Sequence, residues 1–116
     1  MPMIRVQLSR PLEGPARSDL MKKLSTCVAG GLGKPESYMM VVMDPEVPMM
    51  MSANEEPAAL VEVRSVGTIS GQQARDLNGK ISALISEAAG ISSERIYANF
   101  IGVPGAMWGY SGGTFG

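Results

Sequence analysis

The sequence predicts an α/β fold of the α+β kind, in which two β-α-β units form one four-stranded mixed sheet with two helices on one face. Three observations predict this fold. Three short segments alternate apolar and polar residues, two longer segments repeat apolar residues at helical spacing, and the order strand, helix, strand occurs twice. The 116 residues are enough for one domain, 1–116, and too few for a second core.

The first half of the chain contains the first unit. Residues 4–8 alternate as a half-buried strand does, and residues 16–32 place apolar side chains along one helical face. Gly33 then ends the helix, and Pro35 prevents its continuation. Residues 38–43 are apolar on both faces, which predicts a central strand.

The second half repeats this order. Residues 60–64 alternate, Ser70 and Gln73 have the spacing of a capping box at a helix start, and Gly90 ends that helix before a last alternating strand at 95–100. Two helices cover only one face of four strands, so the other face is expected to be polar. It is either an open wet face, which the sequence favours slightly, or part of a subunit interface, and it carries Arg5, Gln7, Glu62, Arg64, Tyr97 and Asn99.

The composition excludes several classes of function. Ten Lys and Arg against eleven Asp and Glu, without a polybasic run, argue against binding of nucleic acid or an anionic membrane. The chain has no histidine and only one cysteine, Cys27, which excludes a structural zinc site, a Ser–His or Cys–His pair and an intramolecular disulfide. No apolar run is long enough to span a bilayer, and Arg5 interrupts any secretory signal, so we expect a soluble, cytoplasmic protein.

Pro2, Lys34 and the Tyr97–Asn99 pair are the candidate catalytic and binding groups. Removal of Met1 would leave Pro2 with a secondary amine, and burial or a nearby cation would lower its pKa towards that of a useful base. Lys34, next to Pro35, is either a clamp for a carboxylate or a solvated turn lysine. Tyr97 and Asn99 share a strand face and can aim donors at one oxygen, but by themselves they indicate only a polar sheet.

Two further segments are unusual in composition. Residues 108–116 contain three aromatic rings, Trp108, Tyr110 and Phe115, and we expect this tail to pack on a pocket or on a neighbouring subunit. The methionines at 39, 40, 43 and 49–51 are interpreted as adaptable core filler. Cys27, on the apolar face of the first helix, is expected to be a buried and inert thiol.

These residues together resemble the macrophage migration inhibitory factor family, within the tautomerase superfamily. The resemblance covers the whole chain, through Met1-Pro2, Gly33-Lys34-Pro35 with Tyr38, Glu56-Pro57, residues 65–67, residues 95–99 and residues 108–115. It implies a homotrimer in which three sheets form a barrel around a channel, with sites between subunits. In that arrangement Pro2 is the base, Lys34 and the backbone near Val66 lie beside it, and Tyr97 and Asn99 come from the adjacent chain. The implied pocket walls are Met3, Tyr38, Trp108, Tyr110 and Phe115.

The resemblance also implies an activity. It is keto–enol tautomerisation of a small aryl 2-oxo acid of the phenylpyruvate type, an isomerase reaction that uses no metal or organic cofactor and requires removal of Met1. The alternative is a cytokine-like protein with an unknown receptor and a vestigial pocket, which would reach the cell exterior without a signal peptide. Ala58-Ala59-Leu60-Val61 stands where the best-known animal members have a Cys-x-x-Cys pair, so no thiol–disulfide activity is expected.

Overall fold

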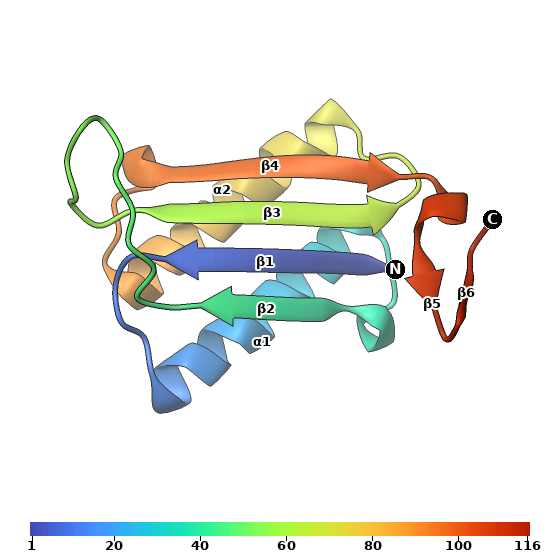
Figure 1. Cartoon of the computed structure of the whole chain (residues 1–116), viewed down its shortest axis with the longest axis horizontal. Coiled ribbons are helices and arrows are strands. Elements are labelled where there is room, and N and C mark those ends of the chain that lie inside the picture. Colours follow the sequence, from blue (N-terminus) through green and yellow to red (C-terminus); the bar gives the residue numbers. More distant parts are fainter.

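Four strands form one mixed sheet in the computed structural model, which describes residues 1–116 (Figure 1). The strand order is β2-β1-β3-β4, with β1 and β2 parallel, β3 and β4 parallel, and β1 and β3 antiparallel. The bounds are β1 Pro2–Leu8, β2 Met40–Asp44, β3 Ala59–Val66 and β4 Ile96–Val103. This is the predicted pair of β-α-β units, which meet along the two central strands.

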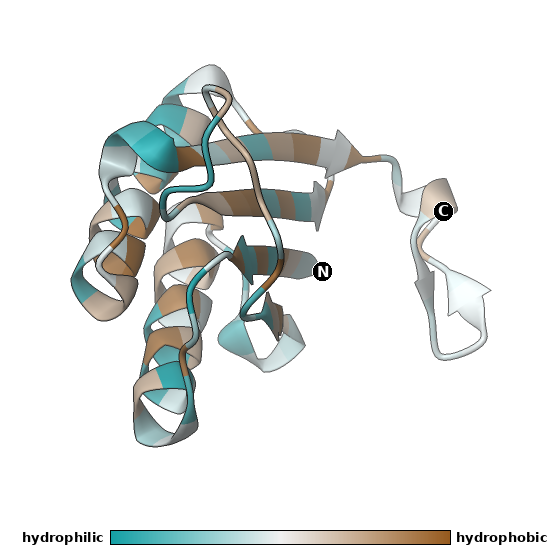
Figure 2. Cartoon of the chain, turned by 60° about the vertical axis from the view of Figure 1, so that its left-hand side comes forward, coloured by the Kyte–Doolittle hydropathy of each residue, from teal (hydrophilic) through white to brown (hydrophobic).

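Both long helices lie on the same face of the sheet (Figures 1 and 2). Helix α1 (Gly14–Leu32) has Pro15 in its first turn, where proline is tolerated, and therefore begins two residues earlier than predicted. Helix α2 (Gly71–Ala89) begins with the predicted capping box between Ser70 and Gln73. Gly33 and Gly90 follow the two helices with φ of 65° and 67°, a left-handed conformation that glycine adopts without steric cost.

The core lies between the sheet and the two helices. Every second residue of β1 and β3 is buried, because successive side chains of a strand point to opposite faces. These strand residues meet the buried stripes of the helices, as the periodicity predicted. The largest fully buried members are Ile4, Val6, Leu8, Val61, Val63, Leu20, Leu24, Val28, Leu77, Ile81, Ile85 and Ile91.

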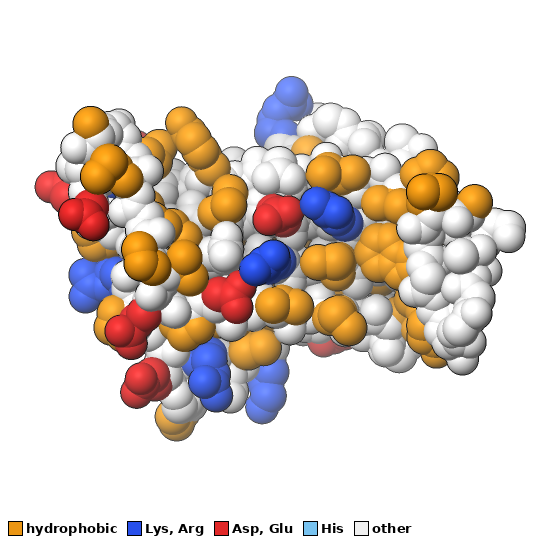
Figure 3. Space-filling view, in the orientation of Figure 1, with side chains coloured by type: hydrophobic (Ala, Val, Ile, Leu, Met, Phe, Trp, Pro, Cys, Tyr) orange, Lys and Arg blue, Asp and Glu red, His pale blue; other side chains and the backbone are white.

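The uncovered face of the sheet is polar, as predicted. Figure 3 shows charged side chains in the middle of this face, with apolar side chains around them. Arg5 pairs with Asp44 at 3.2 Å, and Arg64 pairs with Glu62 at 3.3 Å. Both arginines of this face therefore form ion pairs with carboxylates of the same chain.

The prediction of a central strand at residues 38–43 is wrong. Tyr38 ends a short 3₁₀ helix, Glu36–Tyr38, and β2 begins only at Met40. The strand lies at the edge of the sheet and pairs with β1 alone, and none of its residues is fully buried. Its doubly apolar pattern arises because Val41 and Met43 pack against the core while Met40 and Val42 lie on the uncovered face.

The C-terminal tail folds back on its own chain. After β4 and a 3₁₀ turn, Gly105–Met107, the strands β5 (Gly109–Tyr110) and β6 (Gly113–Thr114) form a small hairpin. The Phe115 N–H donates to the Gly105 carbonyl at 3.0 Å. The hairpin therefore stands beside the end of the sheet where β1 begins (Figure 1).

Candidate active site

Pro2 is the first residue of β1, and the sheet holds it from both sides. It pairs with Ser65 of β3, and the neighbouring Met3 pairs with Met40 of β2. The Val66 N–H donates to the Met1 carbonyl at 3.1 Å, which fixes the chain just before the strand. The Pro2 ring is buried with the helix-facing residues of β1, as strand parity predicts, so its backbone nitrogen is the atom nearest the strand end.

A cleft of about 480 Å³ opens at this end of the sheet. It is lined by both ends of the chain and by the turn before β2, segments far apart in the sequence (Figure 1). Apolar side chains gather here between the sheet and the hairpin in Figure 3. Five predicted site residues line this cleft: Pro2, Met3, Tyr38, Trp108 and Tyr110.

Three aromatic rings form a connected wall at this cleft. Tyr38 meets Tyr110 edge-to-face, with ring centroids 6.4 Å apart and planes at 88°. Phe115 stacks on Tyr110 at 5.6 Å and 21°. Phe115 therefore lies behind Tyr110 and supports that ring, whereas Tyr38 and Tyr110 line the cleft themselves.

Lys34 supplies positive charge near the chain start. It follows the left-handed Gly33, and its N–H donates to the Ala29 carbonyl at 2.9 Å, so the end of α1 determines its position. Lys34 is half-buried and takes part in none of the three ion pairs of the protein. Burial, and secondly the charge of Lys34, lower the pKa of the Met1 amine below its ordinary value.

Tyr97 and Asn99 lie away from the cleft within one chain. Both are on β4, at the edge opposite β2, and both are exposed on the uncovered face. Tyr97 pairs with Leu60 of β3, and Leu60 pairs with Gln7 of β1. Gln7 lies five residues along β1 from Pro2, a distance of roughly 17 Å. Tyr97 borders a separate apolar hollow of about 350 Å³ beside the methionines at 49–51. A site that contains Pro2, Tyr97 and Asn99 together therefore requires a second chain.

The structure adds lining residues that the sequence did not assign to the site. Ser37, Met39 and Met40 border the cleft with Tyr38. Met39 also packs against the core, as expected of filler, but Met40 is 61% exposed and is not a core residue. Met40 lies two residues after Tyr38, which was the available signal in the sequence, but the prediction of a central strand placed Met40 in the core.

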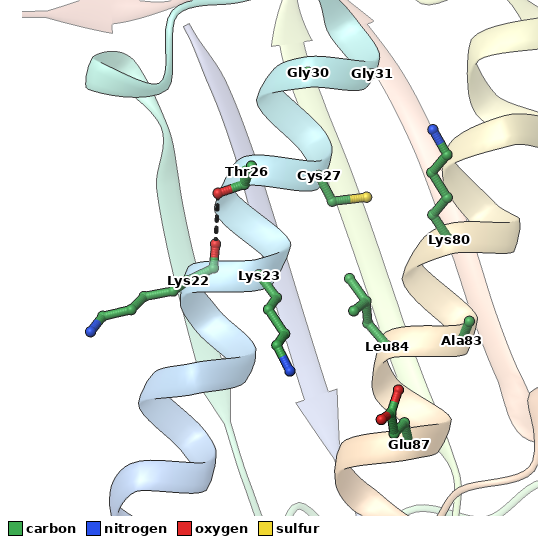
Figure 4. A pocket seen from close by; sticks show the side chains of 10 residues that line it. All are labelled: Lys22, Lys23, Thr26, Cys27, Gly30, Gly31, Lys80, Ala83, Leu84 and Glu87. Atoms are coloured by element: carbon green, nitrogen blue, oxygen red, sulfur yellow. Dashed lines mark hydrogen bonds between the residues drawn. The ribbon is translucent and has the colours of Figure 1, made fainter.

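A larger hollow of about 720 Å³ lies on the other face of the molecule, between α1 and α2 (Figure 4). Three lysines border it, but Lys22 points away from it and Lys23 pairs with Asp19 at 2.9 Å. Cys27 is half-buried there rather than buried as expected, and burial raises its pKa, which keeps the thiol protonated. This groove therefore does not bring reactive groups together as the cleft at Pro2 does.

No group of three or more His, Cys, Asp or Glu residues is placed to hold a metal ion. Neither helix is both long enough and apolar enough to cross a bilayer.

Comparison with known proteins decides the family. The family model described as macrophage migration inhibitory factor (MIF) matches residues 1–116. The chain belongs to the macrophage migration inhibitory factor family. The homolog from Trichuris trichiura is 33% identical over 97 residues, 84% of this chain and 85% of that protein. The macrophage migration inhibitory factor of Rattus norvegicus is 31% identical over 115 residues, 99% of each chain.

Solved structures of MIF homologues have the same fold. The homologue from Prochlorococcus marinus superimposes with a TM-score of 0.92 at 39% identity, over 98% of this chain and 99% of that one. The protein from Toxoplasma gondii gives 0.93 at 25% identity, over 97% and 99%. The two helices and the mixed sheet described above are thus the α+β fold of the MIF family.

Proposed function

We propose that this chain, once Met1 is removed, is a cofactor-independent keto–enol tautomerase for aryl 2-oxo acids of the phenylpyruvate type. The observation that carries the proposal is the meeting of the Pro2 strand start with an aromatic cleft. Lys34 does not line the cleft, but its charge acts on the chain start and it has no anionic partner. Membership of the MIF family supports it. The proposed assembly is the homotrimer that the family resemblance implies, in which Tyr97 and Asn99 would reach the Pro2 cleft from another chain.

The base in this proposal is the Pro2 nitrogen. Removal of Met1 transfers the terminal amine to Pro2, one residue closer to the core. The two causes that lower the pKa of the Met1 amine, burial and the Lys34 charge, act on a Pro2 amine in the same direction. A lowered pKa leaves more of the amine unprotonated near neutral pH, which is the form that accepts a proton.

The remaining groups bind and orient the substrate. Lys34 binds the carboxylate as a point charge, and the aryl ring packs against Tyr38, Trp108 and Tyr110. Met3 forms the wall next to the base, and the Val66 N–H, which in the unprocessed chain donates to the Met1 carbonyl, lies at the same strand end. An apolar enclosure excludes water and so strengthens the attraction between Lys34 and the carboxylate.

The reaction moves one proton and changes no oxidation state. The Pro2 nitrogen takes a proton from the benzylic carbon of the keto acid, and that C–H electron pair forms the carbon–carbon double bond. The carbonyl π pair moves to oxygen, which then receives the proton from the prolinium. Tyr97 and Asn99 of the adjacent chain donate hydrogen bonds to this oxygen as its charge develops.

Turnover of phenylpyruvate by the processed protein tests the proposal. The rate of keto–enol interconversion is followed by aryl-enol absorbance, after mass spectrometry has established that Met1 is absent. A variant with alanine inserted between Met1 and Pro2 keeps every side chain but makes the Pro2 nitrogen an amide, and it should lose activity. A processed wild type no faster than its Pro2→Gly variant would refute the proposal.

A subunit-mixing experiment tests the shared site. Pro2→Gly and Asn99→Ala chains are each expected to be weakly active alone. Random mixed assemblies should regain activity, because about a quarter of their sites combine an intact Pro2 with an intact Asn99. Sedimentation of the protein as a monomer, or mixtures no more active than the parents, would contradict a site built between chains.

Receptor binding is the second candidate function, because relatives of this chain bear the name macrophage migration inhibitory factor, which describes an effect on cells. The two candidates respond differently to the same substitution. Binding to a cell-surface receptor that survives Pro2→Gly, in a protein without measurable turnover, would favour the cytokine-like alternative over the tautomerase.

A further inference from the structure

Lys34 has a carboxylate close to it in the sequence and yet is not paired with it. Glu36 is two residues away, and the intervening Pro35 is extended, with φ of −63° and ψ of 133°. Residues i and i+2 have Cα atoms at most about 7 Å apart, whichever way their side chains leave the backbone. Two long side chains of opposite charge in this arrangement can reach one another, but the structure contains no ion pair between them.

The Glu36 carboxylate is held instead by two hydroxyl groups of α1. Ser25 Oγ donates to Glu36 Oε2 at 3.0 Å, and Thr26 Oγ1 lies 3.3 Å from both carboxylate oxygens. Thr26 Oγ1 is also 3.2 Å from the Lys22 carbonyl of its own helix, which restrains its rotamer. The carboxylate is thus turned towards α1 and is held there by hydrogen bonds.

We propose that Ser25 and Thr26 sequester the Glu36 carboxylate, and that this keeps Lys34 free to bind the carboxylate of the substrate. The inference rests on the proposed function, since it assigns a purpose to the unpaired lysine of that site. Ser25, Thr26 and Glu36 touch no substrate in this account. They are positioning residues that act through Lys34.

The effect of Lys34 on the terminal amine agrees with this role. Its charge lowers the pKa of that amine, which a lysine neutralised by a neighbouring carboxylate would do less. Lys34 is the charged group that faces the amine. Sequestration of Glu36 therefore serves both the binding of an anionic substrate and the lowered pKa of the amine, which leaves more of it unprotonated.

Releasing Glu36 without removing its charge is the direct test. In the Ser25→Ala, Thr26→Val double variant the carboxylate loses its donors and competes for Lys34. At a pH above the amine pKa of every variant, where the base is unprotonated in all of them, we expect KM for phenylpyruvate to rise roughly two- to fivefold, the range for a partly exposed ion pair, with kcat unchanged. KM for the methyl ester of phenylpyruvate, which lacks the carboxylate, should not change.

Adding Glu36→Gln to the double variant separates sequestration from simple anchoring of the turn. The amide carries no charge and cannot compete for Lys34, so KM should return to the wild-type value. An unchanged KM in the double variant would overturn the inference. So would a KM in the triple variant as high as that of the double variant. Ser18→Ala is the matched control, because Ser18 is an exposed residue of the same helix and its hydroxyl is not one of the two that hold Glu36; its KM should equal that of the wild type.

A readout independent of turnover distinguishes this inference from the proposed function. The pKa of the terminal amine, measured from the pH dependence of its alkylation, should rise in the double variant and fall back in the triple variant. If this pattern holds in a protein without tautomerase activity, the proposed function fails and the sequestration stands. If activity depends on Pro2 but the amine pKa is the same in all variants, the sequestration fails alone.

Discussion

Gly31 and its neighbour Gly30 provide a matched test of how α1 packs against α2. A Cβ added at Gly31 would lie 2.4 Å from Cδ2 and 2.8 Å from Cγ of Leu77, closer than carbon atoms can approach. Leu77 is only 1% exposed and is enclosed by the core, so it has little room to move aside. A Cβ added at Gly30 meets no atom within 4 Å. The two substitutions therefore differ only in what the new methyl group touches.

The expected magnitudes follow from this difference. Replacing a helical glycine by alanine stabilises a helix by about 0.5–1 kcal/mol, and Gly30→Ala should gain this amount. Gly31→Ala gains the same helix propensity but overpacks the core at a cost of about 1–3 kcal/mol. The free energies of unfolding of the two variants should thus differ by about 1–3 kcal/mol, with Gly31→Ala the less stable protein.

Urea unfolding of both variants and the wild type measures this difference. All samples are compared at one protein concentration, because dissociation of an oligomer would make the midpoint depend on concentration. The urea midpoint should be higher for Gly30→Ala than for the wild type. The midpoint of Gly31→Ala should be lower than that of Gly30→Ala, and the m-values of all three proteins should be equal. If both alanine variants are equally stabilised, Leu77 does not limit the approach of the helices and the reasoning is refuted.

The remaining predictions concern the amine, the tail, the second helix and the thiol. Lys34→Gln should raise the amine pKa, since the lysine charge lowers it, so the acid limb of the kcat/KM profile should move to higher pH; an unmoved limb would contradict this. Gly105→Ala places a Cβ 2.8 Å from the Phe115 carbonyl oxygen, and should release the tail to faster chymotrypsin cleavage than in the wild type. Ser70→Ala removes the capping box and should cost about 1 kcal/mol in urea unfolding, and an unchanged midpoint would show that the cap is dispensable. Cys27 should react with iodoacetamide at neutral pH more slowly than free cysteine, because burial raises its pKa, and unfolding in urea should remove the difference.

Local chemistry explains why much of the fold could be predicted. The capping box at Ser70 and the glycines at 33 and 90 place helix ends, because each satisfies backbone groups within a few residues of itself. Alternation in β1 and β3 determined which residues face the helices. The place of β2 in the sheet could not be predicted in this way. Where the uncovered face of a sheet is partly apolar, an edge strand has apolar residues on both of its sides. Its sequence then shows the same continuous apolar run as that of a central strand.

The candidate site was predictable to a different extent at each residue. Pro2, Lys34 and Tyr38 were singled out from their local motifs and from the family resemblance, and the structure brings Pro2 and Tyr38 to one cleft. The contribution of Met40 was missed, because it depends on where β2 begins. The position of Tyr97 on the far edge of the sheet depends on strand register, which no short motif specifies.

By itself, the sequence determined the two β-α-β units, the helix ends and the residues of the core, because caps and periodicity act over distances of a few residues. Only the tertiary structure decided that the chain start, the 3₁₀ turn before β2 and the C-terminal hairpin meet at one cleft, and that Glu36 turns towards α1. These contacts join residues distant in the chain, and they depend on how the helices and strands pack. The physical reason is that local interactions specify each element, whereas burial of the shared core specifies how the elements are placed.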